Sequence, residues 1–154
     1  MANQKHLDLL SSGKTLWNKW RREYADVQAV EPDLHGADLH GADLHGVDLH
    51  SADLTEANLQ EADLQDADLR DADLRNANLR NANLSDANLQ KAHLHWADLR
   101  DASLCRANLQ EADLSKADLR GADLDGADLD KADVRGSVRT GDKSVKGVAN
   151  TAFA

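Results

Sequence analysis

The sequence predicts an all-β solenoid with four-sided coils and a short N-terminal α-helical cap. Three observations lead to this fold class. A five-residue repeat runs from residue 32 to residue 136 without an insertion, a leucine stands at the centre of nearly every unit, and alanine lies two positions before each central residue except at Pro32 and Val47. With 154 residues, the chain has the length of one domain and can bury a substantial core.

The spacing of the leucines does not suit a regular helix or a regular strand. They begin at Leu34 and recur at every fifth position to Leu129, and Val134 closes the series. On an α-helix five residues rotate by about 500°, and on a strand alternate leucines point to opposite faces, so neither structure gives one apolar side. The pattern is satisfied if each unit is one side of a square coil. We expect one stack of the core to contain Leu34, Leu54, Leu74, Leu94 and Leu114.

The two positions before each leucine support a corner in every unit. The position two before is alanine from Ala37 to Ala132, apart from Val47, and a small residue suits an interior where four sides converge. The position directly before the leucine is Asp or Asn, except at His93 and Ser103. These short polar side chains hydrogen-bond nearby backbone groups and favour turns. We therefore expect this position to stabilise the corner.

The tandem motif A(D/N)LXX resembles that of the pentapeptide-repeat family. In this chain it reads HGADL, EANLQ, RNANL, EADLS and DGADL, and the resemblance covers 105 of the 154 residues. It implies a right-handed quadrilateral β-helix with four units per coil, which gives about five coils for residues 32–136. At the spacing of about 4.8 Å between hydrogen-bonded strands, the column would be roughly 25 Å long.

Residues 1–31 are predicted to cap the first coil, because the end of a solenoid exposes core side chains and unpaired backbone. We expect a helix at about residues 14–24. One face of this helix would carry Leu16, Trp17, Trp20 and Tyr24. We expect that face to cover the coil, and a helix that binds a membrane or a partner protein is the alternative.

Residues 137–154 leave the repeat, since Arg139 stands where the next central leucine would lie. Four apolar residues are scattered among polar ones here: Val138, Val145, Val148 and Phe153. A second cap, a dimer contact and a tail all fit this segment.

The composition favours a cytoplasmic protein. The net charge of −10 argues against direct binding of nucleic acid or anionic membranes, because both need a basic surface. The N-terminal MANQKHLDLL lacks the apolar run of a secretory signal, and no stretch approaches the roughly 18 apolar residues that span a bilayer. The single cysteine, Cys105, excludes an internal disulfide and suits a reducing compartment. We expect no cofactor.

Residues 20 positions apart fall in one column on the surface of such a solenoid. Arg80, Arg100 and Arg120 form one column, about 4.8 Å apart. Because like charges this close repel, we expect them to pair with neighbouring carboxylates. The nearest candidates are Asp98, Asp101 and Asp118. A site for an anion or an acidic partner is the alternative.

Four histidines recur at one position of consecutive units, namely His35, His40, His45 and His50. Each would leave a different side of the first coil. Ligands of a tetrahedral metal site have to converge on one point, so we expect no metal site here.

The most unusual surface residue is Trp96, which occupies an outward position. Its column contains Gly36, Glu56, Asn76, Lys116 and Gly136. An outward tryptophan has no role in the core, and exposed aromatic residues are frequent anchors of interfaces. His93 and His95 flank it, and Lys116 can stack on its ring. We interpret Trp96, His95 and Lys116 as a contact for a partner, although single exposed apolar residues are also common.

The sequence is best interpreted as a non-catalytic protein-interaction or scaffold solenoid. It contains no spacing typical of a nucleophile with its base, a phosphate-binding loop or a Cys/His metal site, and the regular repeat leaves no obvious cleft. A rigid solenoid would bind a partner protein through its flat faces, and a homodimer is compatible with this interpretation. The fold does not fix the partner.

A DNA-mimicking modulator of DNA gyrase is the alternative. The resemblance implies it, because quinolone-resistance members of the family imitate duplex DNA and bind gyrase in its place, and the net charge of −10 suits that mechanism. Three features oppose it. The column would span only about 7 base pairs. Those proteins often carry Phe at the centre, whereas every centre here is Leu or Val, and residues 70–110 hold five acidic and six basic residues.

Overall fold

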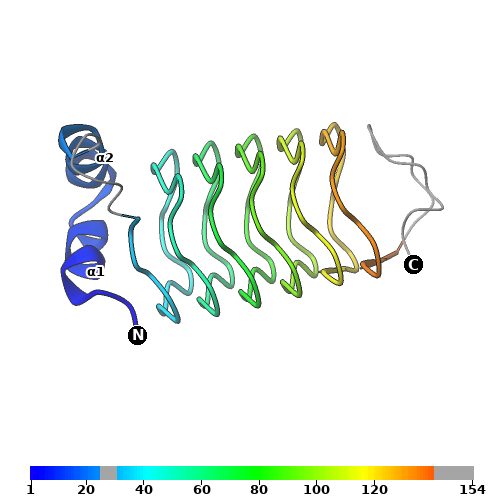
Figure 1. Ribbon diagram of the computed structural model, residues 1–154, viewed down its shortest axis with the longest axis horizontal. Coiled ribbons are helices and arrows are strands. Elements are labelled where there is room, and N and C mark those ends of the chain that lie inside the picture. The colour runs from blue at the N-terminus through cyan, green and yellow to red at the C-terminus, as the bar shows by residue number, and fades with distance from the viewer. Residues whose placement is uncertain (25–30, 141–154) are drawn as a thin grey trace.

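The computed structural model describes residues 1–24 and 31–140, and it consists of two helices followed by a stack of coils. The helices are α1 (Gln4–Ser11) and α2 (Lys14–Glu23). Two coil segments are regular enough to form short strands, β1 (Asp118–Leu119) and β2 (Val138–Arg139). Figure 1 shows both helices at one end of the stack, with the last described residues, drawn in orange, at the other end.

The coils are joined by parallel pairing between residues 20 positions apart. The bridges run from Asp33 with Asp53 to Asp113 with Asp133. Within them, the N–H of Leu34 donates to the carbonyl of Asp53 at 2.8 Å, and the N–H of Asp53 donates to the carbonyl of Pro32 at 2.9 Å. Four five-residue units therefore make one coil, as the repeat predicts.

The interior of the stack is filled by the central leucines and the small residues. Each leucine of the stack that begins at Leu34 and ends at Leu114 is 0% exposed. Burial of one such side chain stabilises the fold by about 1.5–3 kcal/mol. The stack of leucines is therefore the main source of hydrophobic stabilisation in a chain with few aromatic residues. Only the ends are less well covered: Leu39 in the first coil is partly exposed, and Leu124 in the last is 8% exposed.

Each corner is a tight turn between the central residue of one unit and the small residue of the next, which are leucine and alanine in most units. The N–H of Ala57 donates to the carbonyl of Leu54 at 3.1 Å, and Glu56 between them has a φ of 59°. A positive φ at the third residue is typical of a type II turn. The N–H of Thr55 donates to Oδ1 of Asp53 at 3.0 Å, which confirms the predicted turn role of the Asp/Asn position.

The helices replace the missing preceding coil on two of the four sides. On one side, the N–H of Asn3 donates to the carbonyl of Asp33 at 3.0 Å, and the N–H of Asp33 donates to Nδ1 of His6 at 2.9 Å. On another side, Nε1 of Trp17 donates to the carbonyl of Asp48 at 2.6 Å. The cap therefore satisfies backbone groups that a solenoid end would leave unpaired.

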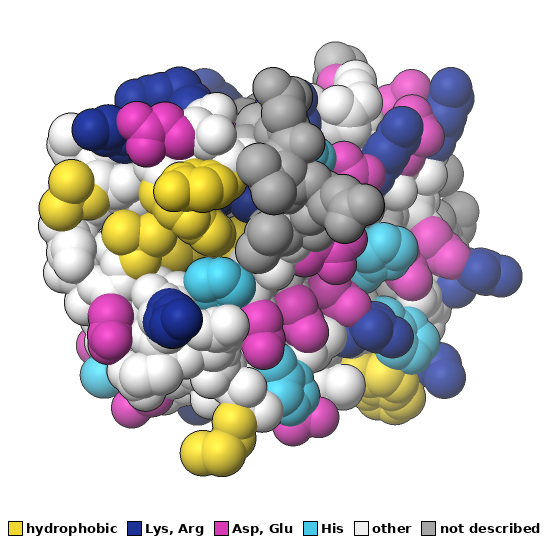
Figure 2. All heavy atoms as spheres, turned by 60° about the vertical axis from the view of Figure 1, so that its left-hand side comes forward, with side chains coloured by type: hydrophobic (Ala, Val, Ile, Leu, Met, Phe, Trp, Pro, Cys, Tyr) yellow, Lys and Arg dark blue, Asp and Glu magenta, His cyan; other side chains and the backbone are white. Residues whose placement is uncertain are grey.

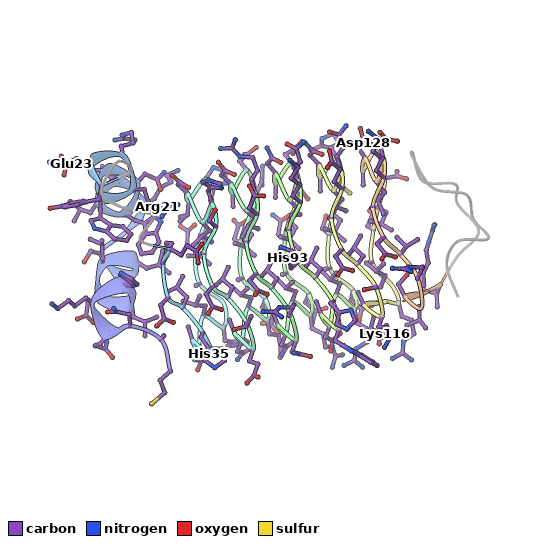
Figure 3. All side chains as sticks on the ribbon, in the orientation of Figure 1. Arg21, Glu23, His35, His93, Lys116 and Asp128 are labelled. Atoms are coloured by element: carbon purple, nitrogen blue, oxygen red, sulfur yellow. The ribbon has the colours of Figure 1, made fainter. Side chains whose placement is uncertain are left out.

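The prediction that one apolar face of α2 covers the first coil is wrong in part. Trp17 is fully buried, but Leu16 and Tyr24 are 52% and 51% exposed. Trp20 is partly buried, and the centroid of its ring lies 5.1 Å from that of Trp17 and 6.4 Å from that of Tyr24. The reason is that the face toward the coil also carries Arg21, which donates to a backbone carbonyl of the first coil at 2.5 Å. Figure 3 shows Arg21 on the side of α2 that faces the coils.

The coil geometry continues past the end of the sequence repeat. Strand β2 pairs in parallel with β1, and the N–H of Val138 donates to the carbonyl of Ala117 at 3.0 Å. Ser137 is buried at the small-residue position, where its hydroxyl donates to the carbonyl of Val134 at 2.6 Å. The cap, dimer contact and tail predicted as alternatives for the C-terminal segment concern residues that lie mostly outside the described part of the chain.

Candidate protein-binding surface

Trp96 projects from a corner near the end of the stack away from the helices. Its side chain is 57% exposed, and its φ of 61° is that of the second outward residue of a unit. The backbone N–H donates to the carbonyl of Ser115 in the next coil at 3.2 Å. The corner is therefore held by the ladder while the indole ring faces outward.

Two neighbours fix the position of the indole ring. The ring of His95 meets it edge-on, with 5.8 Å between centroids and an interplanar angle of 84°. Nδ1 of His95 is itself 2.7 Å from the hydroxyl of Ser115. Nζ of Lys116, one coil further along the same column, lies 4.9 Å from the centroid of the Trp96 ring. Figure 3 shows Lys116 near the end of the stack opposite the helices.

A groove of about 320 Å³ opens beside this ring. Its lining residues are Trp96, Ala97, Asp98, Lys116, Asp118, Gly136 and Val138. We call it the Trp96 groove. Val138, the first residue of β2, is 39% exposed and forms a second apolar wall. Gly136 follows Lys116 in the column and, lacking a side chain, leaves that end of the groove open.

The carboxylates of the Trp96 groove are neutralised by neighbouring arginines. Nη2 of Arg100 lies 2.5 Å from Oδ2 of Asp98, and Nη2 of Arg120 lies 2.6 Å from Oδ2 of Asp118. Nε of Arg100 also lies 3.7 Å from Oδ2 of Asp118. The side-chain hydrogen bond from its arginine holds the pKa of each of these two carboxyls below its usual range. The polar rim is thus ionised and paired.

Arg80 differs from the other two arginines of its column. Its own unit has Asn78 where the units of Arg100 and Arg120 have aspartate. Among the described residues no carboxylate pairs with the Arg80 guanidinium, and its buried Nε lacks a hydrogen-bond partner. The predicted pairing with neighbouring carboxylates therefore holds for Arg100 and Arg120 only.

The histidines of the first coil lie apart on different sides. Nδ1 of His35 is 2.6 Å from Oγ1 of Thr55, and Nδ1 of His50 is 2.9 Å from the carbonyl of Arg70. Within residues 1–24 and 31–140, no three His, Cys, Asp or Glu residues are grouped so that they could hold a metal ion. No helix in those ranges is long and apolar enough to cross a membrane.

The sequence analysis placed Trp96, His95, Lys116 and Gly136 together but missed Val138 as the second wall. Val138 lies 20 positions after Asp118 and Gly136 lies 20 after Lys116. Extending the 20-residue columns beyond residue 136 would also have placed Val138 beside Trp96. The interpretation stopped at residue 136 because Arg139 breaks the leucine series, whereas the backbone pairing does not depend on that side chain.

Parallel coils of 20 residues with outward corners define a β-solenoid repeat protein. The profile described as pentapeptide repeats matches residues 33–71, 67–104 and 102–138, in 8 copies. The chain belongs to the pentapeptide-repeat family. A comparison with curated protein sequences gave no match.

Several solved structures are similar to this chain. The pentapeptide repeat protein Rfr23 from the cyanobacterium Cyanothece 51142 is 33% identical with a TM-score of 0.69, over 80% of this chain and 93% of Rfr23. The pentapeptide repeat protein alr5209 from Nostoc PCC 7120 is 40% identical with a TM-score of 0.55, over 59% of this chain and 77% of alr5209. QnrB1, a plasmid-mediated fluoroquinolone resistance protein, shares the fold at 23% identity and a TM-score of 0.51, over 67% of this chain and 60% of QnrB1.

Proposed function

We propose that this chain is a right-handed quadrilateral β-helix of about five coils that acts as a non-catalytic scaffold and binds a partner protein through the Trp96 groove. The observation that carries the proposal is an exposed tryptophan held beside a second exposed apolar residue, Val138. The single cysteine, Cys105, supports action in a reducing compartment such as the cytoplasm.

The geometry of the groove favours the side chain of a protein over a metabolite. Pockets that enclose drug-sized ligands usually measure about 300–1,000 Å³, and this groove, at about 320 Å³, lies at the lower limit of that range. Trp96 is restrained by His95 and Lys116, so less side-chain entropy is lost on binding. An apolar anchor of the partner would fit between Trp96 and Val138, surrounded by a rim of paired charges.

The titratable groups at the groove support a binding role without catalysis. A general acid or base works best when its pKa lies near the operating pH. Here the hydrogen bonds from arginine lower the pKa of Asp98 and Asp118, which moves both carboxyls away from neutral pH. They therefore serve better as fixed charges than as proton carriers.

Affinity capture from a native extract tests this proposal, with the tagged wild-type protein compared with Trp96→Ala and Val138→Asp. Leu16→Ala is the matched control, because Leu16 is 52% exposed and lies on α2 at the other end of the stack. We expect specific partners to be retained by the wild type and by Leu16→Ala and to be lost from both groove variants. Partners that all four proteins retain equally would contradict the proposal.

A further inference from the structure

Among residues 1–24 and 31–140, hydrogen bonds close the capped end of the solenoid on two sides and leave it open on the other two. Asn3, His6 and Trp17 supply hydrogen bonds to the backbone at Asp33 and Asp48. On the sides of Asp38 and Asp43, no described residue bonds the backbone N–H or C=O that a preceding coil would pair. An open edge of this kind is a template for another extended segment. Figure 1 shows the helices lying across this end.

A hollow of about 650 Å³ lies over the two open sides, between α1 and the first coil. Its apolar lining comes from Leu7, Leu10, Leu39, Ala42 and Leu44. In the next coil, the residues equivalent to Leu39 and Ala42 are almost completely buried, whereas these two are partly exposed. The first core layer is therefore incompletely covered on the sides where the backbone edge is open.

The charges around the hollow favour a basic ligand. Three carboxylates, those of Asp8, Asp38 and Asp43, lie among its lining residues, against one lysine, Lys14. A segment that pairs with the edge has to be extended, has to carry apolar side chains toward Leu39, and gains from basic side chains near the carboxylates.

We propose that residues 141–154 of a second copy of this chain bind in the hollow as an added strand. This segment carries Lys143 and Lys146 against a single acid, Asp142. Its apolar side chains are Val145, Val148 and Phe153, and its Ala149–Asn150 pair repeats the small residue and turn residue of a coil unit. Basic and apolar side chains are thus combined in one segment, as the hollow requires.

The positions of the two contact regions determine the form of the assembly. The hollow lies at the end with the helices. Thr140, after which the segment begins, lies at the opposite end of the stack, where its hydroxyl accepts a hydrogen bond from the N–H of Gly121. Each molecule would therefore use a different surface toward each neighbour. Such head-to-tail contacts form a ring where the rotation between neighbours closes and an open chain where it does not, and in both cases the assembly grows with concentration.

Sedimentation velocity of the full-length protein over a range of micromolar concentrations tests the proposal. We expect the weight-average sedimentation coefficient of the wild type to rise with concentration. Asp38→Lys/Asp43→Lys should weaken self-association at least about tenfold, because basic side chains would then face Lys143 and Lys146. Glu61→Lys/Glu111→Lys is the matched control, since it makes the same change in net charge at exposed corners outside the hollow, and it should associate like the wild type.

A charge-reversal experiment shows whether the two regions contact each other. Lys143→Glu/Lys146→Glu should also prevent association, and mixing it with Asp38→Lys/Asp43→Lys should restore it in the mixture. Circular dichroism should show that every variant remains folded. A wild type that stays monomeric at all concentrations would overturn the proposal, and this is also the result expected if the segment binds its own chain. Variants that do not restore association when mixed would overturn it as well.

Discussion

At the scale of single residues, the corners carry the main conformational cost of the fold. Fifteen corners place a residue other than glycine at φ values between 55° and 61°. L-residues avoid this left-handed region, and each such residue costs on the order of 1–3 kcal/mol unless its surroundings hold it there. Here the turn hydrogen bond and the ladder to the next coil hold it, as at Lys91, whose N–H donates to the carbonyl of Gln110 at 2.9 Å.

Replacing Lys91 by valine should therefore destabilise the protein although the side chain is exposed. A β-branched residue at a φ of 59° is strongly disfavoured, so we expect a loss of about 1–3 kcal/mol in the free energy of unfolding. Lys91→Gly should be neutral or stabilising, because glycine adopts this φ without strain. Urea denaturation measures both changes.

The neighbouring Gln90 provides the control, since it is outward but lacks a positive φ. Gln90→Val should change the free energy of unfolding by less than about 0.5 kcal/mol. Equal losses for valine at positions 90 and 91 would contradict the corner geometry.

The burial and the turn position of most single residues can be predicted from the sequence, because the environment repeats every five residues. Once one leucine and one aspartate are assigned to the core and the turn, the same assignment follows for the equivalent residues of the other units. The pairing of Arg100 with a neighbouring carboxylate was predicted, but the choice of Asp98 among the candidates depends on side-chain conformation as well as on position. The exception at Arg80 follows from one substitution in its unit, Asn78 in place of aspartate.

At the scale of elements, the cap matters because it closes the core and pairs part of the exposed backbone. Trp17 combines both roles: its ring is fully buried and its Nε1 donates to the carbonyl of Asp48. The sequence predicted α2 from its aromatic spacing, but α1 was not predicted. The contacts that hold α1 against the first coil, from Asn3 and His6 to Asp33, join residues about 30 positions apart, and such long-range contacts leave no local pattern in the chain.

Replacing Trp17 by alanine should cost about 3–5 kcal/mol, as for other buried aromatic residues. Trp17→Phe should cost less, because it keeps most of the apolar contact and loses only the hydrogen bond to Asp48. Thermal unfolding followed by circular dichroism measures both. Leu16→Ala, a change at the exposed neighbour on α2, should have little effect, and a loss at Leu16 as large as that at Trp17 would show that the cap is seated differently.

At the scale of the whole molecule, the acidity of the sequence does not become a continuous acidic surface. Five arginines pair with the aspartate two residues before them, and Arg106 pairs with Asp86 of the preceding coil. Figure 2 shows acidic, basic and histidine side chains interspersed over the face in view. Because salt bridges on the surface contribute little individually, about 0–1 kcal/mol, these pairs shape the electrostatic field more than they stabilise the fold.

The ion pairs make the stability of the fold dependent on pH in the acidic range. Hydrogen bonds from Arg135 lower the pKa of Asp133 to about 2, and those from Arg120 lower the pKa of Asp118. A carboxyl whose pKa is lower in the folded state stabilises the protein above its unfolded pKa of about 3.9, and this contribution is lost as the pH falls through the folded value. We expect the stabilisation from these two carboxyls to stay constant from pH 7 to pH 5, and the melting temperature to decrease as it is lost from about pH 4 to pH 2.

The double variant Arg120→Gln/Arg135→Gln should reduce this acid dependence. It removes the donors that lower both pKa values, so less stability is left to lose on protonation. Thermal melts of the wild type and the variant at a series of pH values provide the comparison. Identical pH profiles for the two proteins would mean that these pairs do not form in solution.

The central claim is that the molecule recognises its partner locally, at the Trp96 groove, and not through an overall charge that imitates DNA. A supercoiling assay with purified DNA gyrase tests it most directly. A positively charged DNA channel would meet a nearly neutral band between Arg70 and Arg106, where six basic residues offset five acidic ones, so it would lack the attraction that continuous negative charge provides. We predict no inhibition of supercoiling at micromolar protein. Sub-micromolar inhibition that disappears at higher salt and in Asp53→Asn/Glu56→Gln/Glu61→Gln would contradict the claim.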